Sequence, residues 1–279
     1  MFTTLDLLIE QGKATSLDGG YNHCFLVSSN GSEITYKVLR NIPFKKRIRQ
    51  AELKLLHLVF SQIPSHAYML RSKGGVISRE VETLKIWKSQ GIPSPQVLDY
   101  SVDSIACLHI PGHDYDQVLK KPFADQTFTK LVETISAIRK LAFDLDDPNL
   151  LHPDMRPHNF VYSSDFDLAY AIDPGMLIRQ DLSVSDVDSR VNLFFCFSML
   201  AGNYPGKVRY VEQFLDSIEK PQLELMRELN QPLGLVVGSY LTLRERAGNF
   251  VRQRRPTTLF EDYNSNVLLV NDLIRNCVD

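Results

Sequence analysis

Three side chains near the middle of the chain have types and spacing that suit the transfer of a phosphoryl group. Asp154 and Asn159 lie five residues apart in HPDMRPHNF, and Asp173 follows in AIDPGM. Such a transfer needs a carboxylate that faces the acceptor hydroxyl and oxygen ligands that hold a metal beside the phosphates. We therefore assign Asp154 as the catalytic carboxylate and Asn159 and Asp173 as ligands of Mg²⁺.

Two further residues belong to the same segment. His152 begins the spacing H-x-D-x-x-x-x-N, and we expect it to brace the loop by hydrogen bonding. Gly175 lets the chain bend sharply after Asp173. A polar surface hairpin with a coincidental set of residues is the alternative. The strand-like segments around the motif and the long helical run before it favour the catalytic interpretation.

A lysine in the N-terminal part of the chain is the candidate for binding the phosphates. Lys37 lies in ITYKVLR, which alternates as a strand does, and its ammonium can reach the phosphates of ATP. An edge-strand lysine that limits aggregation is the plainer alternative. A helix carboxylate is needed to fix the lysine. Glu80 is the first candidate, and Glu82 and Glu52 remain open.

Backbone groups are expected to make the other contacts with the nucleotide. Gly19 and Gly20 stand at a predicted strand turn, where glycine lets N–H groups approach phosphate oxygens. A plain turn explains this pair equally well. Residues 107–109 connect the two parts of the chain, and from this layout we expect the adenine to lie against Cys107 and His109.

Histidines also suggest a zinc site, which we disfavour. His109 and His113 are four residues apart, but the Pro-Gly pair between them prevents a helix from presenting both on one face. His152 and His158 lie close in sequence. No cysteine or glutamate completes either pair at a familiar spacing.

The overall composition is that of an ordinary soluble globular protein. Of 279 residues, 44% are hydrophobic and 23% are charged, which is enough for a proper core. The net charge of −2 argues against nucleic-acid binding, which requires a basic excess. The four cysteines are far apart, so no disulfide framework is expected. We find no signal peptide and no apolar run long enough to span a membrane, and we expect a cytoplasmic protein.

Two basic clusters have an open interpretation. Each is either a solvated face, which is the plainer interpretation, or a binding surface for an anionic substrate, a membrane surface or nucleic acid. The first comprises Lys45, Lys46, Arg47 and Arg49, and the second comprises Arg252, Arg254 and Arg255.

Periodicity predicts the elements that must position these residues. The first forty residues read as a short helix and then a three-stranded antiparallel meander with a hairpin turn at Asn30-Gly31. Later segments alternate between helical and strand patterns, and the region after residue 184 is mostly helical. The expected elements are a helix at 2–12, an apolar helical run within 41–60, helices at 76–90 and 124–144, strands within 104–110, 150–162 and 167–176, and helix breaks near Pro205, Pro221 and Pro256.

This layout predicts an α+β fold with two lobes. Residues 1–109 form a small antiparallel-sheet lobe on the ATP-phosphate side, and residues 110–279 form a larger, mainly helical lobe with the catalytic loop. The cleft between the lobes is the expected ligand site.

Three blocks of the sequence resemble the protein-kinase-like superfamily. They are ITYKVLR, REVETLKIWKSQGIPSPQVLDY, and LLHPDMRPHNF with AIDPGM, and together they span about residues 17–176. The chain is most similar to the short atypical branch, which includes RIO-type kinases, small tRNA-modification-associated kinases and lipopolysaccharide-core sugar kinases. Aminoglycoside phosphotransferases are similar in motif. The resemblance implies a bilobal fold that uses ATP and Mg²⁺, and it favours Glu80 over Glu52 because an R-E-x-x-x-L helix runs into a G-I-P-x-P turn.

The sequence departs from the family pattern at several positions. Pro153 stands where Arg or Gly is usual, Pro174 replaces the Phe of D-F-G, and the glycine loop has two glycines. None of these changes removes a phosphate or metal ligand. Because no A-P-E motif is present, a sugar, glycan or small molecule is the expected hydroxyl acceptor, and residues 177–279 are expected to shape its pocket. An atypical Ser/Thr protein kinase, a nucleotide-binding pseudokinase and a nucleotidyl transferase are the alternatives.

Overall fold

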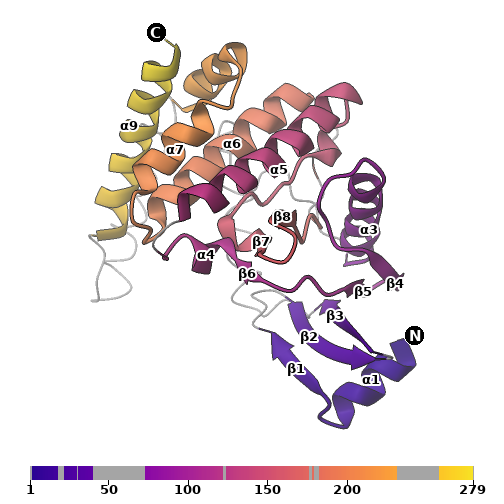
Figure 1. Cartoon of the computed structure of the whole chain (residues 1–279). Helices are drawn as coiled ribbons and strands as arrows, with labels where there is room; N and C mark the ends of the chain where they lie inside the picture. The colour runs from indigo at the N-terminus through magenta and orange to yellow at the C-terminus, as the bar shows by residue number, and fades with distance from the viewer. Residues whose placement is uncertain are drawn as a thin grey trace, which may run out of the picture.

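An antiparallel sheet at the N-terminal end of the chain lies beside a larger body of helices (Figure 1). The structure is a computed structural model. Several sequence-based predictions fall outside the residues that it describes, namely those for Gly19, Gly20, Asn30, residues 41–60 with their basic cluster and Glu52, the second basic cluster and Pro256. The described residues are 2–17, 22–29, 31–39, 73–121, 124–175, 178, 182–230 and 258–278.

The N-terminal sheet has five strands, and every pair of neighbouring strands is antiparallel. Its first three strands are the predicted meander. Helix α1 (Phe2–Glu10) packs on one face, where Leu5 joins Val27 and Tyr36 in a small core. In spatial order the strands are β1 (Ala14–Leu17), β2 (Asn22–Ser29), β3 (Ser32–Leu39), β5 (Ser104–Leu108) and β4 (Val97–Tyr100).

The register of β3 decides which face of the sheet receives Lys37. Ile34 and Tyr36 belong to the small core under α1. Because side chains alternate along a strand, Thr35 and Lys37 lie on the opposite face. Lys37 pairs with Ile105 of β5, which belongs to the main core of the protein. The lysine is therefore presented toward the helical body.

Helix α3 (Lys73–Ser89) covers this second face and matches the helix that the sequence predicts at 76–90. Ile77, Val81, Leu84 and Trp87 are spaced by three or four residues, so they form one stripe along the helix. All four are buried in the main core. The helix ends before Gly91, whose φ of 76° is the left-handed conformation that glycine adopts without strain.

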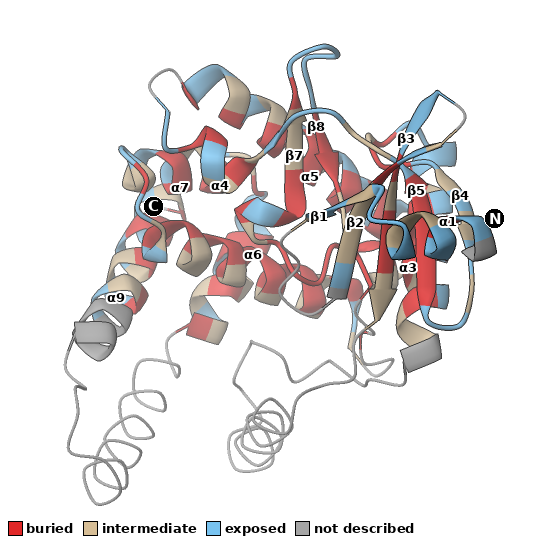
Figure 2. Cartoon of the chain, turned by 90° about the horizontal axis from the view of Figure 1, so that it is seen from below, coloured by how far each residue is buried: buried red, intermediate tan, exposed pale blue. Residues whose placement is uncertain are grey.

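The helical body is built around α5 and α6, and it carries a small three-stranded sheet of β6, β7 and β8. Figure 2 shows buried residues concentrated along α6 and along strands β5, β7 and β8. The elements are α4 (Tyr115–Val118), α5 (Ala124–Asp144), α6 (Val184–Ala201), α7 (Lys207–Leu215), helical residues 220–230, α9 (Thr258–Val278), β6 (His113–Asp114), β7 (Phe160–Ser163), β8 (Leu168–Ala171) and the short 3-10 helices η1 (Pro148–Leu150) and η2 (Pro157–Asn159).

The predicted helix breaks near Pro205 and near Pro221 are both confirmed. Residues 202–206 separate α6 from α7. Pro221 is the second residue of the helix at 220–230, and the break precedes it at residues 216–219. Proline is tolerated in the first turn of a helix because its missing N–H has no partner there in any case.

The predicted α+β architecture is confirmed, with a small antiparallel sheet beside a larger, mainly helical body. No helix in the described part of the chain is long and apolar enough to cross a bilayer.

Candidate functional site

Lys37, Glu80 and Asp173 form one charge cluster between the sheet and the helical body. The Lys37 Nζ donates to Glu80 Oε2 at 2.6 Å and to Asp173 Oδ1 at 2.5 Å. The three residues come from β3, from α3 and from the segment after β8. Lys37 and Glu80 are buried, whereas the side chain of Asp173 is 46% exposed. The cluster therefore joins three distant segments and is open to solvent at Asp173.

One lysine is shared by two carboxylates, and this sets the charges in the cluster. Burial alone lowers the pKa of Lys37, but Asp173 and Glu80 outweigh burial and the pKa of the lysine is raised. Burial raises the pKa of Glu80 to about 7, although Lys37 acts in the opposite direction. Lys37 therefore stays an ammonium, and Glu80 is the carboxylate that can take up a proton near neutral pH.

The structure distinguishes between the candidate glutamates on α3. Glu80 is buried and contacts Lys37. Glu82 points outward and lies 3.7 Å from Arg79 as an exposed ion pair. Glu80 and not Glu82 is thus brought to the lysine.

His152 connects the loop of Asp154 to the segment of Asp173. Its Nε2 lies 2.8 Å from Ile172 O, and its Nδ1 lies 3.3 Å from the backbone N of Asp154. The first partner can only accept and the second can only donate. The ring is therefore the neutral tautomer with hydrogen on Nε2. Burial also lowers the pKa of His152, which favours this neutral state.

Asn159 is fixed by the same loop and leaves an oxygen uncommitted. Its Nδ2 donates to Asp154 O at 2.8 Å, and its backbone O accepts from Ile172 N at 2.9 Å. Among the described residues, neither Asn159 Oδ1 nor the second carboxylate oxygen of Asp173 takes a hydrogen bond. These two hard oxygens are suitable ligands for Mg²⁺.

The turn after β8 is built differently from the prediction. Asp173 itself has a φ of 58°, which is left-handed and strained for a residue other than glycine. Gly175 has no such conformation. Instead, a Cβ on Gly175 would lie 2.8 Å from Glu80 Oε2 and 3.2 Å from Val76 Cγ1. Glycine is needed here because α3 approaches the backbone closely.

Arg156 is a site residue that the sequence analysis missed. Its Nε donates to Asp154 Oδ1 at 2.5 Å, and its Nη2 donates to the other oxygen. Burial raises the pKa of Asp154, but Arg156 outweighs it and the pKa is lowered. Arg156 N also donates to Asp154 O at 2.8 Å, so the chain turns tightly at Met155 and brings the two side chains together. An arginine two positions after the aspartate was the available signal.

Cys107 and His109 lie on the same side of the sheet as Lys37. Cys107 pairs with Thr35 in the β3–β5 register, and burial raises the pKa of its thiol to about 12, so the thiol stays neutral. The His109 ring lies 3.0 Å from Thr35 Oγ1. The His109 backbone N–H already donates to Glu33 O. A base bound there would therefore use other groups of this segment.

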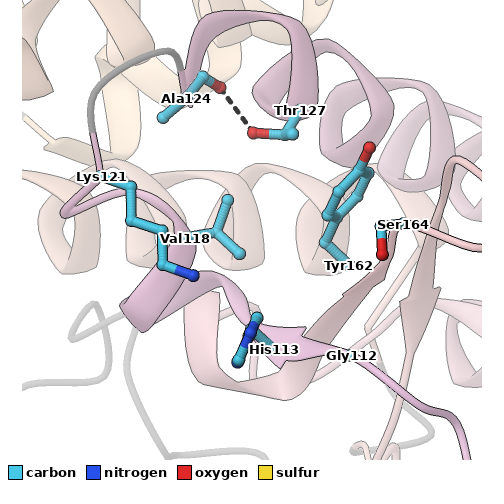
Figure 3. Close-up of a pocket in the computed structure, with 8 residues that line it drawn as sticks. All are labelled: Gly112, His113, Val118, Lys121, Ala124, Thr127, Tyr162 and Ser164. Atoms are coloured by element: carbon cyan, nitrogen blue, oxygen red, sulfur yellow. Dashed lines mark hydrogen bonds between the residues drawn. The ribbon is translucent and has the colours of Figure 1, made fainter.

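A separate cavity of about 280 Å³ lies beside β6 and β7 (Figure 3). None of its lining residues belongs to the predicted site. In the part of the chain that the structure describes, no group of three or more His, Cys, Asp or Glu is placed to hold a metal ion. The cavity is lined by Gly112, His113, Val118, Lys121, Ala124, Thr127, Tyr162 and Ser164.

Comparison with known proteins adds little to this geometry. No family model matches the chain, and no curated protein matches it. Among solved structures, the kinase domain of PknI from Mycobacterium tuberculosis aligns over 68% of this chain and 73% of its own, with a TM-score of 0.36 and 13% identity. A likeness of that size supports no argument, so the interpretation of the site rests on its own residues.

Proposed function

We propose that this protein is a phosphotransferase that moves the γ-phosphoryl group of Mg-ATP to a hydroxyl acceptor. The observation that carries the proposal is Lys37, held between Glu80 and Asp173 beside a loop that contains Asp154 and Asn159. Phosphoryl transfer depends mainly on positioning and on neutralising charge. The cluster supplies one cation and several oxygen ligands in a fixed arrangement.

Lys37 is the residue that would bind the phosphates of ATP. Glu80 holds the ammonium from the buried side, so only the side toward Asp173 opens to solvent. A buried lysine that lacks an opposing carboxylate would lose its proton more easily. The shift in the pKa of Lys37 therefore supports a permanently charged phosphate ligand.

Asn159 Oδ1 and the second oxygen of Asp173 would hold Mg²⁺. When bound, this ion neutralises charge on the phosphates. Asn159 is already oriented for this purpose, because its Nδ2 is engaged by Asp154 O. Phosphate oxygens and water would complete the coordination.

Asp154 would accept the proton of the acceptor hydroxyl. The hydroxyl oxygen forms a bond to the γ-phosphorus, the bond from that phosphorus to the β–γ bridging oxygen breaks, and ADP leaves with the electron pair. In the structure, both oxygens of Asp154 accept hydrogen bonds from Arg156. Phosphate oxygens compete well for a guanidinium, so we expect Arg156 to turn toward the phosphoryl group and free the carboxylate.

A sugar, a glycan or another small molecule is the acceptor class that we propose, with a Ser or Thr of a protein as the alternative. The acceptor would enter on the side of the helical body. The boundary between the two lobes would fall at residue 109, just after the end of β5.

A non-catalytic nucleotide-binding scaffold is the second candidate. The pairing of Arg156 with both oxygens of Asp154 favours it, because a base held in this way cannot accept a proton. The two candidates differ in whether Arg156 releases Asp154 when ATP binds.

The first experiment is thermal unfolding with ATP, with and without Mg²⁺. A ligand present at a hundredfold over its dissociation constant adds about 2.7 kcal/mol of stability. We expect stabilisation by ATP that depends on Mg²⁺. No stabilisation at millimolar ATP would reject both candidates.

The second experiment separates catalysis from binding. ATP labelled at the γ-phosphate is incubated with the protein and fractionated cell extract, and parallel samples carry the label at the α-phosphate. We expect γ-label in an acceptor, and we expect roughly a 10²–10⁴-fold loss in Asp154→Asn with Mg-ATP binding retained. The matched control is Asp125→Asn, which removes an exposed carboxylate paired with Arg209. Binding without product supports the scaffold, and transfer of α-label indicates nucleotidyl transfer.

A further inference from the structure

Trp87 lies near the C-terminal end of α3. Its side chain contacts Leu150 and His152, at the start of the loop that contains Asp154. We propose that Trp87 is the positioning residue that holds α3 against this loop and so fixes Glu80 and Asp173 around Lys37. The importance of this for activity rests on the proposed function, but the geometry can be tested without it.

Two contacts attach Trp87 to the loop. The side chain is fully buried, and its Nε1 donates to Leu150 O at 3.0 Å. Its ring centroid lies 5.8 Å from that of His152, with an interplanar angle of 33°. The hydrogen bond fixes the direction of the indole, and the ring contact fixes the position of the histidine.

His152 carries the connection onward to Asp173. Its Nε2 donates to Ile172 O, the carbonyl immediately before Asp173, and its ring packs 5.2 Å from Phe160 at the start of β7. One side chain thus separates the indole from the backbone of Asp173. The left-handed φ of Asp173 has to be maintained by such neighbours.

The helix itself carries the connection to Glu80. Glu80 and Trp87 are seven residues apart, which is about two turns and about 10.5 Å along the axis, so both side chains lie on nearly the same face. A helix is stiff over this distance. The position of Trp87 therefore determines how far Glu80 extends toward Lys37.

Helix α3 makes a second close contact in its N-terminal half. Gly175 lies against Glu80 and Val76, with no space for a Cβ. After the helix ends, Pro93 O accepts from Ala171 N at 3.0 Å, which holds the following segment to β8. Trp87 and the close approach at Gly175 therefore hold α3 at two points, against the loop that contains Asp154 and against the segment of Asp173.

Filling space does not by itself explain a tryptophan here. Leucine or phenylalanine would also exclude water, but neither could donate to Leu150 O. The indole also supplies the ring against His152. Phenylalanine removes only the N–H donor, and leucine removes both the donor and the aromatic ring. Comparing the two variants separates packing from positioning.

The test compares Trp87→Phe and Trp87→Leu with the control Phe214→Leu. Phe214 is an equally buried aromatic residue of α7, and its ring packs against Phe195 in the helical body. All variants are studied at least about 15 °C below their own Tm, so that each remains folded. The readouts are acetylation of Lys37 by an amine-reactive ester, measured by mass spectrometry, and the Kd for Mg-ATP. Acetylation of the exposed Lys140 serves as the internal standard.

We expect Trp87→Leu to raise the acetylation rate of Lys37 about tenfold and to weaken Mg-ATP binding about tenfold, because misplacement of about 1 Å is costly at such sites. Trp87→Phe should fall between it and the wild type, while Phe214→Leu should change neither readout. Wild-type behaviour in Trp87→Leu would overturn the inference, as would an equal effect of Phe214→Leu.

The acetylation arm does not depend on the proposed function. If the wild type does not bind Mg-ATP, the proposed function fails, and the labelling of Lys37 still decides whether Trp87 positions the cluster. If Trp87→Leu does not fold, the comparison of Trp87→Phe with the wild type decides the question by the same two readouts.

Discussion

Two clusters in the described part of the chain place one buried cation between two carboxylates. In the first, Lys37 lies between Glu80 and Asp173. In the second, Arg139 of α5 donates to both oxygens of Asp188, at 2.8 and 3.1 Å, and to Glu219 at 3.1 Å. Although the two clusters have the same charge composition, they differ in how completely their polar atoms are used.

The Arg139 cluster satisfies its buried carboxylate within the helical body. Both oxygens of the fully buried Asp188 accept from Arg139, and Asn192 adds a third bond at 3.0 Å. The Lys37 cluster leaves one oxygen of Asp173 open, with a half-exposed side chain and strained backbone. The difference teaches that a carboxylate whose oxygens are both bonded, such as Asp188, stabilises the fold, whereas one that keeps an oxygen open, such as Asp173, retains binding capacity for a ligand.

Arg139→Met should produce the largest effect, and the effect should be on stability. It leaves Asp188 buried without its cation, which costs about 3–5 kcal/mol of the free energy of unfolding. Urea unfolding measures this loss. The affinity of the folded fraction for Mg-ATP should stay within about twofold, because no atom of the Lys37 cluster or of the Asp154 loop is altered. A loss of stability below about 1 kcal/mol would break the comparison.

Lys37→Met should mainly reduce activity and should reduce stability less. Phosphate transfer should fall about 10²–10³-fold, the usual cost of removing one charged ligand of the reacting group. The stability loss should be smaller than for Arg139→Met, since Glu80, with its raised pKa, can take up a proton when its partner is removed. The control is Lys140→Met, which removes only an exposed i,i+4 pair with Asp144. Equal stability losses in the two methionine variants would contradict the distinction.

The sequence predicts the Lys37 cluster better than the Arg139 cluster. Lys37 lies in an alternating strand, Glu80 in an R-E-x-x-x-L helix, and Asp173 follows the H-x-D-x-x-x-x-N segment. Helix α5 is predictable to its ends because its apolar stripe has a strong helical period. Arg139 and Asp188 are 49 residues apart in sequence, and no local pattern requires them to meet.

Other features depend on three-dimensional packing alone. The pairing of Arg156 with Asp154 depends on a tight turn between them, closed by the bond from Arg156 N to Asp154 O, which the sequence does not specify. The close approach of α3 to Gly175 gives that glycine a steric role instead of the predicted sharp bend.

The pH dependence of stability tests the role of His152, which connects the loop of Asp154 to the segment of Asp173. Burial lowers the pKa of His152, so in the window below about 6.5 the unfolded chain binds a proton that the folded chain does not. The free energy of unfolding should therefore fall with falling pH, by up to about 1.4 kcal/mol per pH unit. His152→Gln should flatten this slope, whereas His113→Gln, on the exposed β6, should not. An unchanged slope in His152→Gln would show that another group dominates.

Gly175→Ala should produce the smallest effect. The added methyl overlaps Glu80 Oε2 and should displace it from Lys37, which we expect to weaken Mg-ATP binding several-fold, or about 1 kcal/mol. Gly202→Ala is the matched control, because its methyl would overlap the ring of Tyr204 in the helical body. The control should lose stability while keeping its Mg-ATP affinity. If both alanines weaken binding equally, the close approach at Gly175 has no specific role.

The left-handed backbone of Asp173 gives Lys37 a second task. Such a conformation costs on the order of 1–3 kcal/mol, and the carboxylate of Asp173 is held in it by the ammonium. Without the lysine, we expect Asp173 to relax to a negative φ and its side chain to turn away from Glu80. The ion pair therefore also holds the main chain, so that losing the Lys37 amine would displace the proposed metal ligand Asp173 without mutating it.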